Sequence, residues 1–136
     1  MNFLSQFQDY DFQWHGVRLP KIELGPQQKI SIGALSNSDN YTYLTHLVNR
    51  GSEEKLKNGK IDASKVKIYA DRCKMELDVF RKHNLVDYVL LVYDILQWCD
   101  DNEIARGVAR GSASGSLTFY LLGSNRIDPI THSLPF

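Results

Sequence analysis

The sequence predicts an α+β fold in which three helices are followed by a strand, a glycine- and serine-rich turn and a last helix. Apolar residues recur at helical spacing over about 40–50, 62–83 and 87–99, which predicts three helices. A short apolar segment, 104–108, then precedes the turn, and its length and position predict a strand. The apolar run over 117–122 predicts a final helix after the turn.

Capping residues and composition justify each helix in turn. Asp39 is a suitable N-cap for the first helix, and Gly51 is the predicted stop. Asp62 is a suitable N-cap for the second helix, which has the most regular apolar spacing of the chain. The third helix, over 87–99, is apolar at almost every position, so we expect it to be buried on most sides. Gly123 is expected to end the last helix.

Length and charge favour a single domain without a strong electrostatic field. The chain has 136 residues, of which 16 are basic and 16 acidic, so any attraction for nucleic acid must be local. Residues 1–38 are rich in aromatic residues and interrupted by glycine and proline, which predicts an extended linker or edge segment before a domain over 39–136. Cys73 and Cys99 lack CxxC spacing. They indicate a reduced, cytoplasmic protein, and no segment predicts a membrane span or a targeting signal.

The richest segment for function is the run from Arg110 to Leu117, RGSASGSL. Small residues allow a ligand to approach the backbone closely, and amide, hydroxyl and guanidinium donors together suit a phosphate. The run is neither a Walker A loop nor a GxGxxG fingerprint. Glycines four residues apart are equally typical of close helix packing, so both interpretations stay open on spacing alone. The candidate phosphate-binding residues are Arg110, Gly111, Ser112, Gly115 and Ser116.

Other patterns give weaker support for a reactive centre. The acidic cluster Asp100, Asp101 and Glu103 is more typical of a solvated loop than of a metal site. The four histidines are scattered without zinc-ligand spacing, and no arrangement of residues suggests a nucleophilic triad. We therefore expect neither metal ligands nor catalytic residues in this chain.

Ordered motifs around the turn resemble the bacterial C-family replicative DNA polymerases of the DNA polymerase III alpha-subunit type, at the start of their palm domain. The resemblance covers roughly residues 20–136. Upstream it includes Tyr69 to Arg72 with Glu76-Leu77, and the segment Tyr88 to Asp94. Around and after the turn it rests on Ile104, Gly107, Arg110-Gly111-Ser112-Ala113, Gly115-Ser116-Leu117, Tyr120, Leu122-Gly123, Ile127-Asp128-Pro129 and Leu134.

This resemblance implies an incomplete nucleotidyltransferase palm, related in fold to that of DNA polymerase beta. Arg110, Gly111 and Ser112 would contact the triphosphate of an incoming dNTP, and Gly115 and Ser116 would shape or extend the same turn. Mg²⁺ is expected in the completed active site, held by aspartates that this chain lacks. Asp128 is the one acidic residue after Ser112 and matches a non-catalytic family position. The chain is therefore expected to be inactive in DNA synthesis by itself.

Three functional hypotheses follow from the resemblance. The first is a split polymerase subunit that acts in DNA replication with dNTP, primer–template DNA and other chains carrying the aspartates. The second is a non-catalytic module, a regulator or decoy, that binds a nucleotide or a partner. The third is a truncated remnant without a role of its own. Val108, Ala109 and Arg106 depart from the family pattern, which is consistent with a divergent, viral relative acting in a host cytoplasm.

Overall fold

The computed structural model describes residues 20–31, 39–109 and 111–136. Its elements, in chain order, are α1 (Pro26–Ser31), α2 (Asn40–Lys57), the 3₁₀ turn η2 (Ala63–Lys65), α3 (Val66–Lys82), α4 (Val86–Asp101), the 3₁₀ turn η3 (Gly111–Gly115) and α5 (Leu117–Leu121). Every regular element within these ranges is helical. The fold is therefore a small helical assembly.

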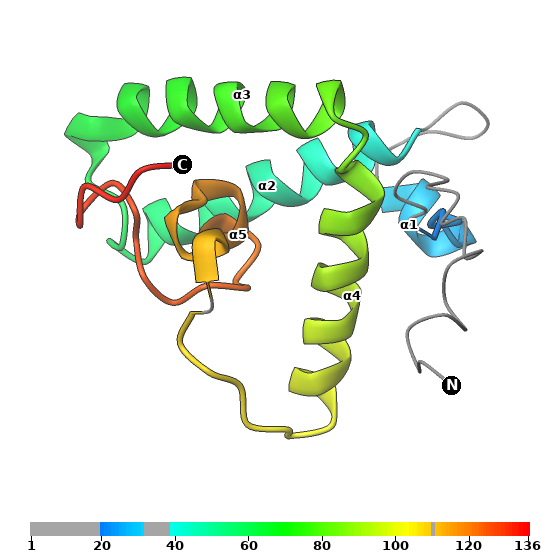
Figure 1. Cartoon of the computed structure of the whole chain (residues 1–136). Coiled ribbons are helices and arrows are strands. Elements are labelled where there is room, and N and C mark those ends of the chain that lie inside the picture. Colours follow the sequence, from blue (N-terminus) through cyan, green and yellow to red (C-terminus); the bar gives the residue numbers. More distant parts are fainter. Residues whose placement is uncertain (1–19, 32–38, 110) are drawn as a thin grey trace, which may run out of the picture.

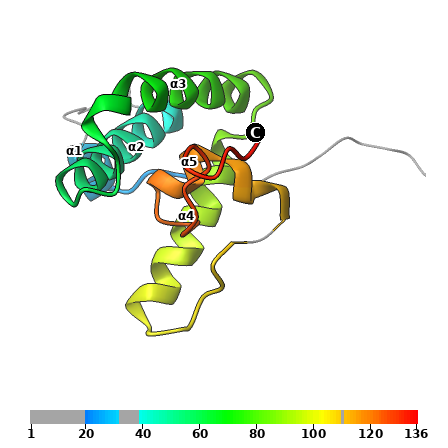
Figure 2. The same ribbon diagram turned by 90° about the vertical axis from the view of Figure 1, so that its left-hand side faces the viewer.

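Two long helices support the rest of the structure. Helices α2 and α3 run side by side in opposite directions, and α4 turns away from the end of α3 and packs across α2 (Figure 1). The short helix α5 lies against both α2 and α3. Figure 2 shows that the C-terminal end of α4 extends away from the other helices. The glycine- and serine-rich turn lies between this projecting helix and the packed centre.

Helix α5 forms the centre of the hydrophobic core. All five of its residues are buried, and Leu117 has no exposed surface. Leu44 and Val48 of α2 and Val89 of α4 pack into the same core. At 25 cal/mol per Å² of buried apolar surface, a fully buried leucine contributes about 2–3 kcal/mol. The core therefore fixes the position of α5 and of the turn that precedes it.

The predicted strand over 104–108 is wrong, and with it the α+β fold class and the strand-containing palm. No strand is present in the part of the chain that the structure describes. Glu103 leaves α4 in the left-handed conformation, with φ +56°, and both Ile104 and Val108 are about half exposed. A strand requires a ladder of hydrogen bonds to a second extended segment. Here the Val108 carbonyl accepts a bond of 2.9 Å from the Arg126 N–H, and the described residues form no ladder around it.

Several helix predictions are confirmed in kind and corrected in extent. Asp39 caps α2 through the Thr42 N–H at 2.8 Å, but α2 continues through Gly51 to Lys57. Gly51 serves packing, since a Cβ there would lie 2.0 Å from the Leu121 carbonyl oxygen. Asp62 caps η2, which leads into α3. Gly123, with φ +77°, follows the end of α5 as predicted.

Helix α4 is much less buried than its apolar sequence predicts. Only Val89 and Leu90 among its sixteen residues are fully buried, and Trp98 is 59% exposed. The prediction is wrong because one side of α4 packs on α2 while its C-terminal end extends away from the other helices (Figure 2). Tyr88, Val92 and Leu96, on another side of α4, line an open groove.

The predicted extended segment over 1–38 contains one short helix, α1, in its described part. Residues 1–19 and 32–38 lie outside the described residues. The division into a segment 1–38 and a domain 39–136 stays a prediction.

Candidate functional site

The glycine- and serine-rich turn has an exposed first half. Gly111 has φ +58°, a left-handed conformation that favours glycine, and a Cβ at this position would meet no atom within 4 Å. Gly111 and Ser112 are both exposed. The Ser114 hydroxyl donates a hydrogen bond of 2.7 Å to the Gly111 carbonyl and so closes η3 from one side. Arg110, the predicted cationic contact, lies outside the described residues.

The second half of the turn is enclosed by the protein. A Cβ at Gly115 would lie 1.9 Å from the carbonyl oxygen of Pro135, so glycine is required there for close packing. Ser116 is 2% exposed and acts as the N-cap of α5, because its Oγ accepts the Phe119 N–H at 3.3 Å. Of the predicted site residues, the structure therefore exposes Gly111 and Ser112 and buries Gly115 and Ser116.

A buried carboxylate occupies the position in front of α5. Glu76 of α3 has no exposed surface. Its oxygens accept hydrogen bonds from the Ser116 hydroxyl at 2.8 Å, the Leu117 N–H at 2.9 Å and the Thr118 N–H at 2.8 Å. The Leu117 and Thr118 N–H groups are the first amides of α5, which lack partners within their own helix. Glu76 therefore supplies the negative charge that the start of α5 favours.

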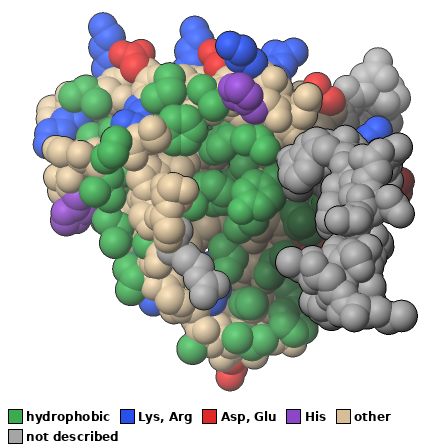
Figure 3. Space-filling model, in the orientation of Figure 1, with side chains coloured by type: hydrophobic (Ala, Val, Ile, Leu, Met, Phe, Trp, Pro, Cys, Tyr) green, Lys and Arg blue, Asp and Glu red, His purple; other side chains and the backbone are tan. Residues whose placement is uncertain are grey.

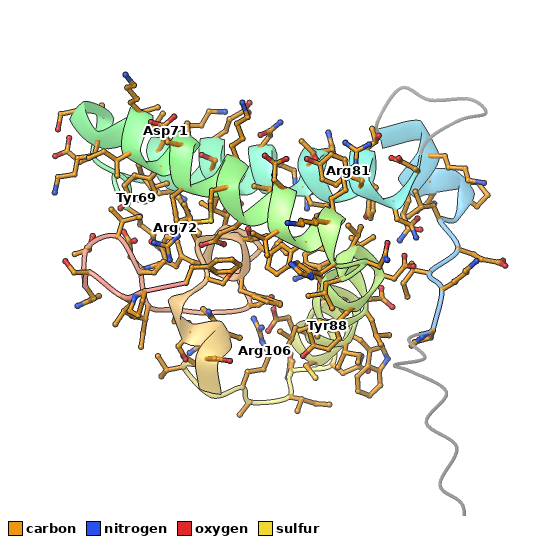
Figure 4. The ribbon with its side chains drawn as sticks, turned by 45° about the horizontal axis from the view of Figure 1, so that its top comes forward. Tyr69, Asp71, Arg72, Arg81, Tyr88 and Arg106 are labelled. Carbon is orange, nitrogen blue, oxygen red and sulfur yellow. The ribbon has the colours of Figure 1, made fainter. Side chains whose placement is uncertain are left out.

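Arg72 neutralises Glu76 and ties it to the rest of the site. Its Nε donates to Glu76 at 2.8 Å, one helical turn away on α3. Its second terminal nitrogen donates to the carbonyl oxygens of Gly115 at 2.9 Å and of Leu134 at 3.3 Å. Figure 4 shows Arg72 reaching from α3 toward the turn and the C-terminal segment. One side chain thus connects α3, the turn and the end of the chain.

The contribution of Glu76 was missed by reasoning from sequence. In the sequence, Arg72 and Glu76 stand out only as part of a family motif, with no indication of a function at the turn. The available signal was the pairing of arginine and glutamate four residues apart, on one face of the predicted helix. Nothing in the sequence itself indicates that this face of α3 meets residues 116–118, some 40 positions later.

An open groove of about 750 Å³ lies beside the exposed half of the turn. Its wall on the α4 side is hydrophobic, and η3 supplies its polar edge. The face viewed in Figure 3 is largely hydrophobic, with Lys and Arg along its upper border. The volume falls within the range of ligand-binding clefts. The lining residues are Tyr88, Val92, Leu96, Arg106, Gly107, Ala109, Gly111, Ser112, Ala113, Phe119, Ser124 and Asn125.

Polar groups in the groove differ in how they are paired. Arg106 binds Asp100 through two contacts of 2.6 Å, and Figure 4 shows its side chain between η3 and α4. Asn125 donates a bond of 2.5 Å to the Ala113 carbonyl and so helps to hold η3. The Ser124 hydroxyl is buried without a hydrogen-bond partner among the described residues. The groove thus contains one paired cation, exposed turn residues and an unsatisfied hydroxyl.

The described residues do not fit a magnesium site. They contain no cluster of three or more histidine, cysteine, aspartate or glutamate side chains that could hold a metal ion. Asp100 is paired with Arg106, and Asp128 accepts hydrogen bonds from the Tyr69 hydroxyl, the Ile130 N–H and the Thr131 hydroxyl. No catalytic step can therefore be assigned to a metal on these residues.

Within the described ranges, no helix combines the length and the apolar character needed to cross a bilayer.

Comparisons with known proteins agree on one family. The family model for the bacterial DNA polymerase III alpha NTPase domain matches residues 42–136. The DNA polymerase III subunit alpha of Aquifex aeolicus is 33% identical over 118 residues, which is 87% of this chain and 9% of the relative. The proteins of the same name are 49% identical over 70 residues in Ureaplasma parvum and 35% over 108 in Pasteurella multocida. These matches cover 52% and 76% of this chain, and 7% and 9% of the relatives.

Proposed function

The chain belongs to the bacterial DNA polymerase III alpha family, and from this membership we propose that it contributes the triphosphate-binding turn of a DNA polymerase that acts in replication. The observation that carries the proposal is the exposed pair Gly111 and Ser112 at the edge of an open groove. Phosphoryl transfer requires from the protein mainly positioning and neutralisation of charge. A turn with free space in front of its backbone suits the first of these requirements.

The groove suits the remaining parts of a nucleotide. Its hydrophobic wall, which includes Tyr88 and Phe119, can pack against a base or a sugar, while the η3 edge meets the phosphates. Arg110 precedes the exposed pair in sequence and adds a positive charge. Gly115 and Ser116 support the turn from inside the protein. We assign direct contact with phosphate to Arg110, Gly111 and Ser112.

We propose that another polypeptide supplies the aspartates that hold Mg²⁺. Asp128 is committed to Tyr69 and Thr131, so it is not available as a ligand. The chain spans less than a tenth of the length of these relatives. DNA synthesis with primer–template DNA is accordingly proposed for the completed assembly.

A calorimetric titration of the 136-residue chain with a dNTP in the presence of Mg²⁺ tests the proposal. Ser112→Ala is expected to weaken binding about tenfold, since a hydrogen bond to a charged group contributes about 1.5–3 kcal/mol. Arg110→Ala should weaken it by a similar factor. Ser64→Ala, at an exposed serine in η2, is the matched control and should bind normally. Equal affinity of Ser112→Ala and the wild type would contradict the assignment.

A complementation assay separates a polymerase subunit from a module that only binds nucleotide. The chain is mixed with a polypeptide that carries the remainder of a family polymerase, and the mixture is tested for copurification and primer extension. Extension that is lost with Ser112→Ala supports the polymerase role. Nucleotide binding without copurification or extension would favour the non-catalytic module.

A further inference from the structure

We propose that Glu76, held by Arg72, is the positioning residue of the glycine- and serine-rich turn. This inference rests on the proposed function of the turn. The Glu76 carboxylate occupies the start of α5 as an internal anion, so that half of the turn is closed to phosphate. The exposed half is thereby held at a fixed place on the edge of the groove.

The hydrogen bonds explain how one side chain can fix a backbone segment. One oxygen of Glu76 accepts from the Leu117 N–H, and the other accepts from both the Ser116 hydroxyl and the Thr118 N–H. The carboxylate therefore restrains three consecutive residues. Bonds to a charged acceptor in a buried site are among the strongest in proteins. Residues 116–118 cannot shift along α3 without breaking them.

The restraint extends from α5 to the exposed half of the turn. Ser116 N–H donates to the Ala113 carbonyl at 3.1 Å, and Arg72 holds the Gly115 carbonyl at 2.9 Å. Asn125 also donates to the Ala113 carbonyl. Ala113 directly follows Ser112, so the fixed end of η3 lies one residue from the proposed phosphate contact. Loss of the Glu76 bonds would free residues 116–118, to which η3 is joined through Ser116, and would leave η3 held by Arg72 and Asn125 alone among these contacts.

Glu76→Gln is the decisive variant because it keeps the shape and removes the charge. The amide can replace at most one of the two oxygens as an acceptor. We expect the folded variant to bind dNTP at least tenfold more weakly than the wild type in the calorimetric titration. Asp78→Asn, an exposed carboxylate on the same helix, changes the net charge equally and is expected to bind normally. Normal binding by folded Glu76→Gln would overturn the proposal.

Chemical rescue distinguishes positioning from general stability. Glu76→Ala leaves the α5 amides and Arg72 around a space the size of a small carboxylate. Added acetate, compared with chloride at equal ionic strength, should restore part of the dNTP affinity of Glu76→Ala and leave Asp78→Asn unchanged. A folded Glu76→Ala variant that acetate stabilises without any recovery of affinity would contradict a positioning role.

A measurement on the wild type keeps the inference testable if neither variant folds. Amide hydrogen exchange should show that Leu117 and Thr118 are protected far more strongly than Gly111 and Ser112. Fast exchange at Leu117 and Thr118 would overturn the proposed restraint of residues 116–118 by Glu76. If the wild type shows this protection but binds no dNTP, the proposed function fails while the restraint by Glu76 stands as a structural fact.

Discussion

Helices α4 and α5 are both largely apolar in sequence, but they differ in how deeply the fold buries them. All five residues of α5 are buried, whereas α4 buries fully only Val89 and Leu90 of its sixteen. Helix α5 contacts both α2 and α3, whereas the described contacts of α4 are mainly with α2. Apolar composition predicts that a helix is buried, but the arrangement of the neighbouring elements determines how much of its surface is buried.

The turn between these helices is likewise part buried and part exposed. Its second half belongs to the buried part of the molecule around α5, here called the closed region, where Gly115 touches the C-terminal segment and Ser116 binds Glu76. Its first half, Gly111 and Ser112, belongs to the open region beside α4. Binding residues require both conditions, since the open part receives the ligand and the closed part fixes its geometry.

Removal of a side chain from each helix should give the largest contrast. Leu117→Ala is expected to lower the free energy of unfolding by about 4 kcal/mol, because the Leu117 side chain has no exposed surface and its removal would leave a cavity. Ile95→Ala on α4, where the side chain is 52% exposed, should change it by less than about 0.5 kcal/mol. Urea unfolding followed by circular dichroism measures both. Similar losses for the two variants would show that α4 is buried in solution.

Added methyl groups should separate the same two regions by a smaller margin. A Cβ at Gly51 would lie 2.0 Å from the Leu121 carbonyl oxygen, and one at Gly107 would meet nothing within 4 Å. We expect Gly51→Ala to lose about 2–3 kcal/mol, because overpacking outweighs the gain of roughly 1 kcal/mol in helix propensity. Gly107→Ala should stay within about 0.5 kcal/mol of the wild type. Thermal unfolding of the pair tests this, and a stabilised Gly51→Ala would contradict the close approach of α2 and α5.

The sequence predicted local features better than contacts between distant segments. The helix periods, the Asp39 cap and the glycine after α5 depend on neighbouring residues, and the structure has them. The strand over 104–108 failed because a strand depends on a partner, and apolar residues in a short segment do not reveal whether one exists. The turn was recognised from composition, but its division into open and closed halves depends on Glu76 of α3 and Pro135 near the end of the chain. Such long-range contacts leave no local pattern.

The smallest expected effect concerns the buried hydrogen bond between Tyr69 and Asp128, whose contribution to stability depends on pH. Tyr69 is 4% exposed and donates a hydrogen bond to Asp128. Burial, followed by this bond, raises the pKa of Tyr69 from 10.0 to about 12. Because the folded state holds the proton more tightly, this stabilisation is complete below pH 10 and is lost as the pH rises toward 12.

Tyr69→Phe should therefore cost about 1 kcal/mol at pH 7 through the lost hydrogen bond. Tyr88→Phe, at a half-exposed tyrosine on α4, should cost less at the same pH. Urea unfolding between pH 8 and 12 should show the stability of the wild type falling toward that of Tyr69→Phe above pH 10. A constant difference across this range would mean that the phenol of Tyr69 ionises as readily in the folded chain as in the unfolded one. The closed region would then not include the Tyr69–Asp128 contact in solution.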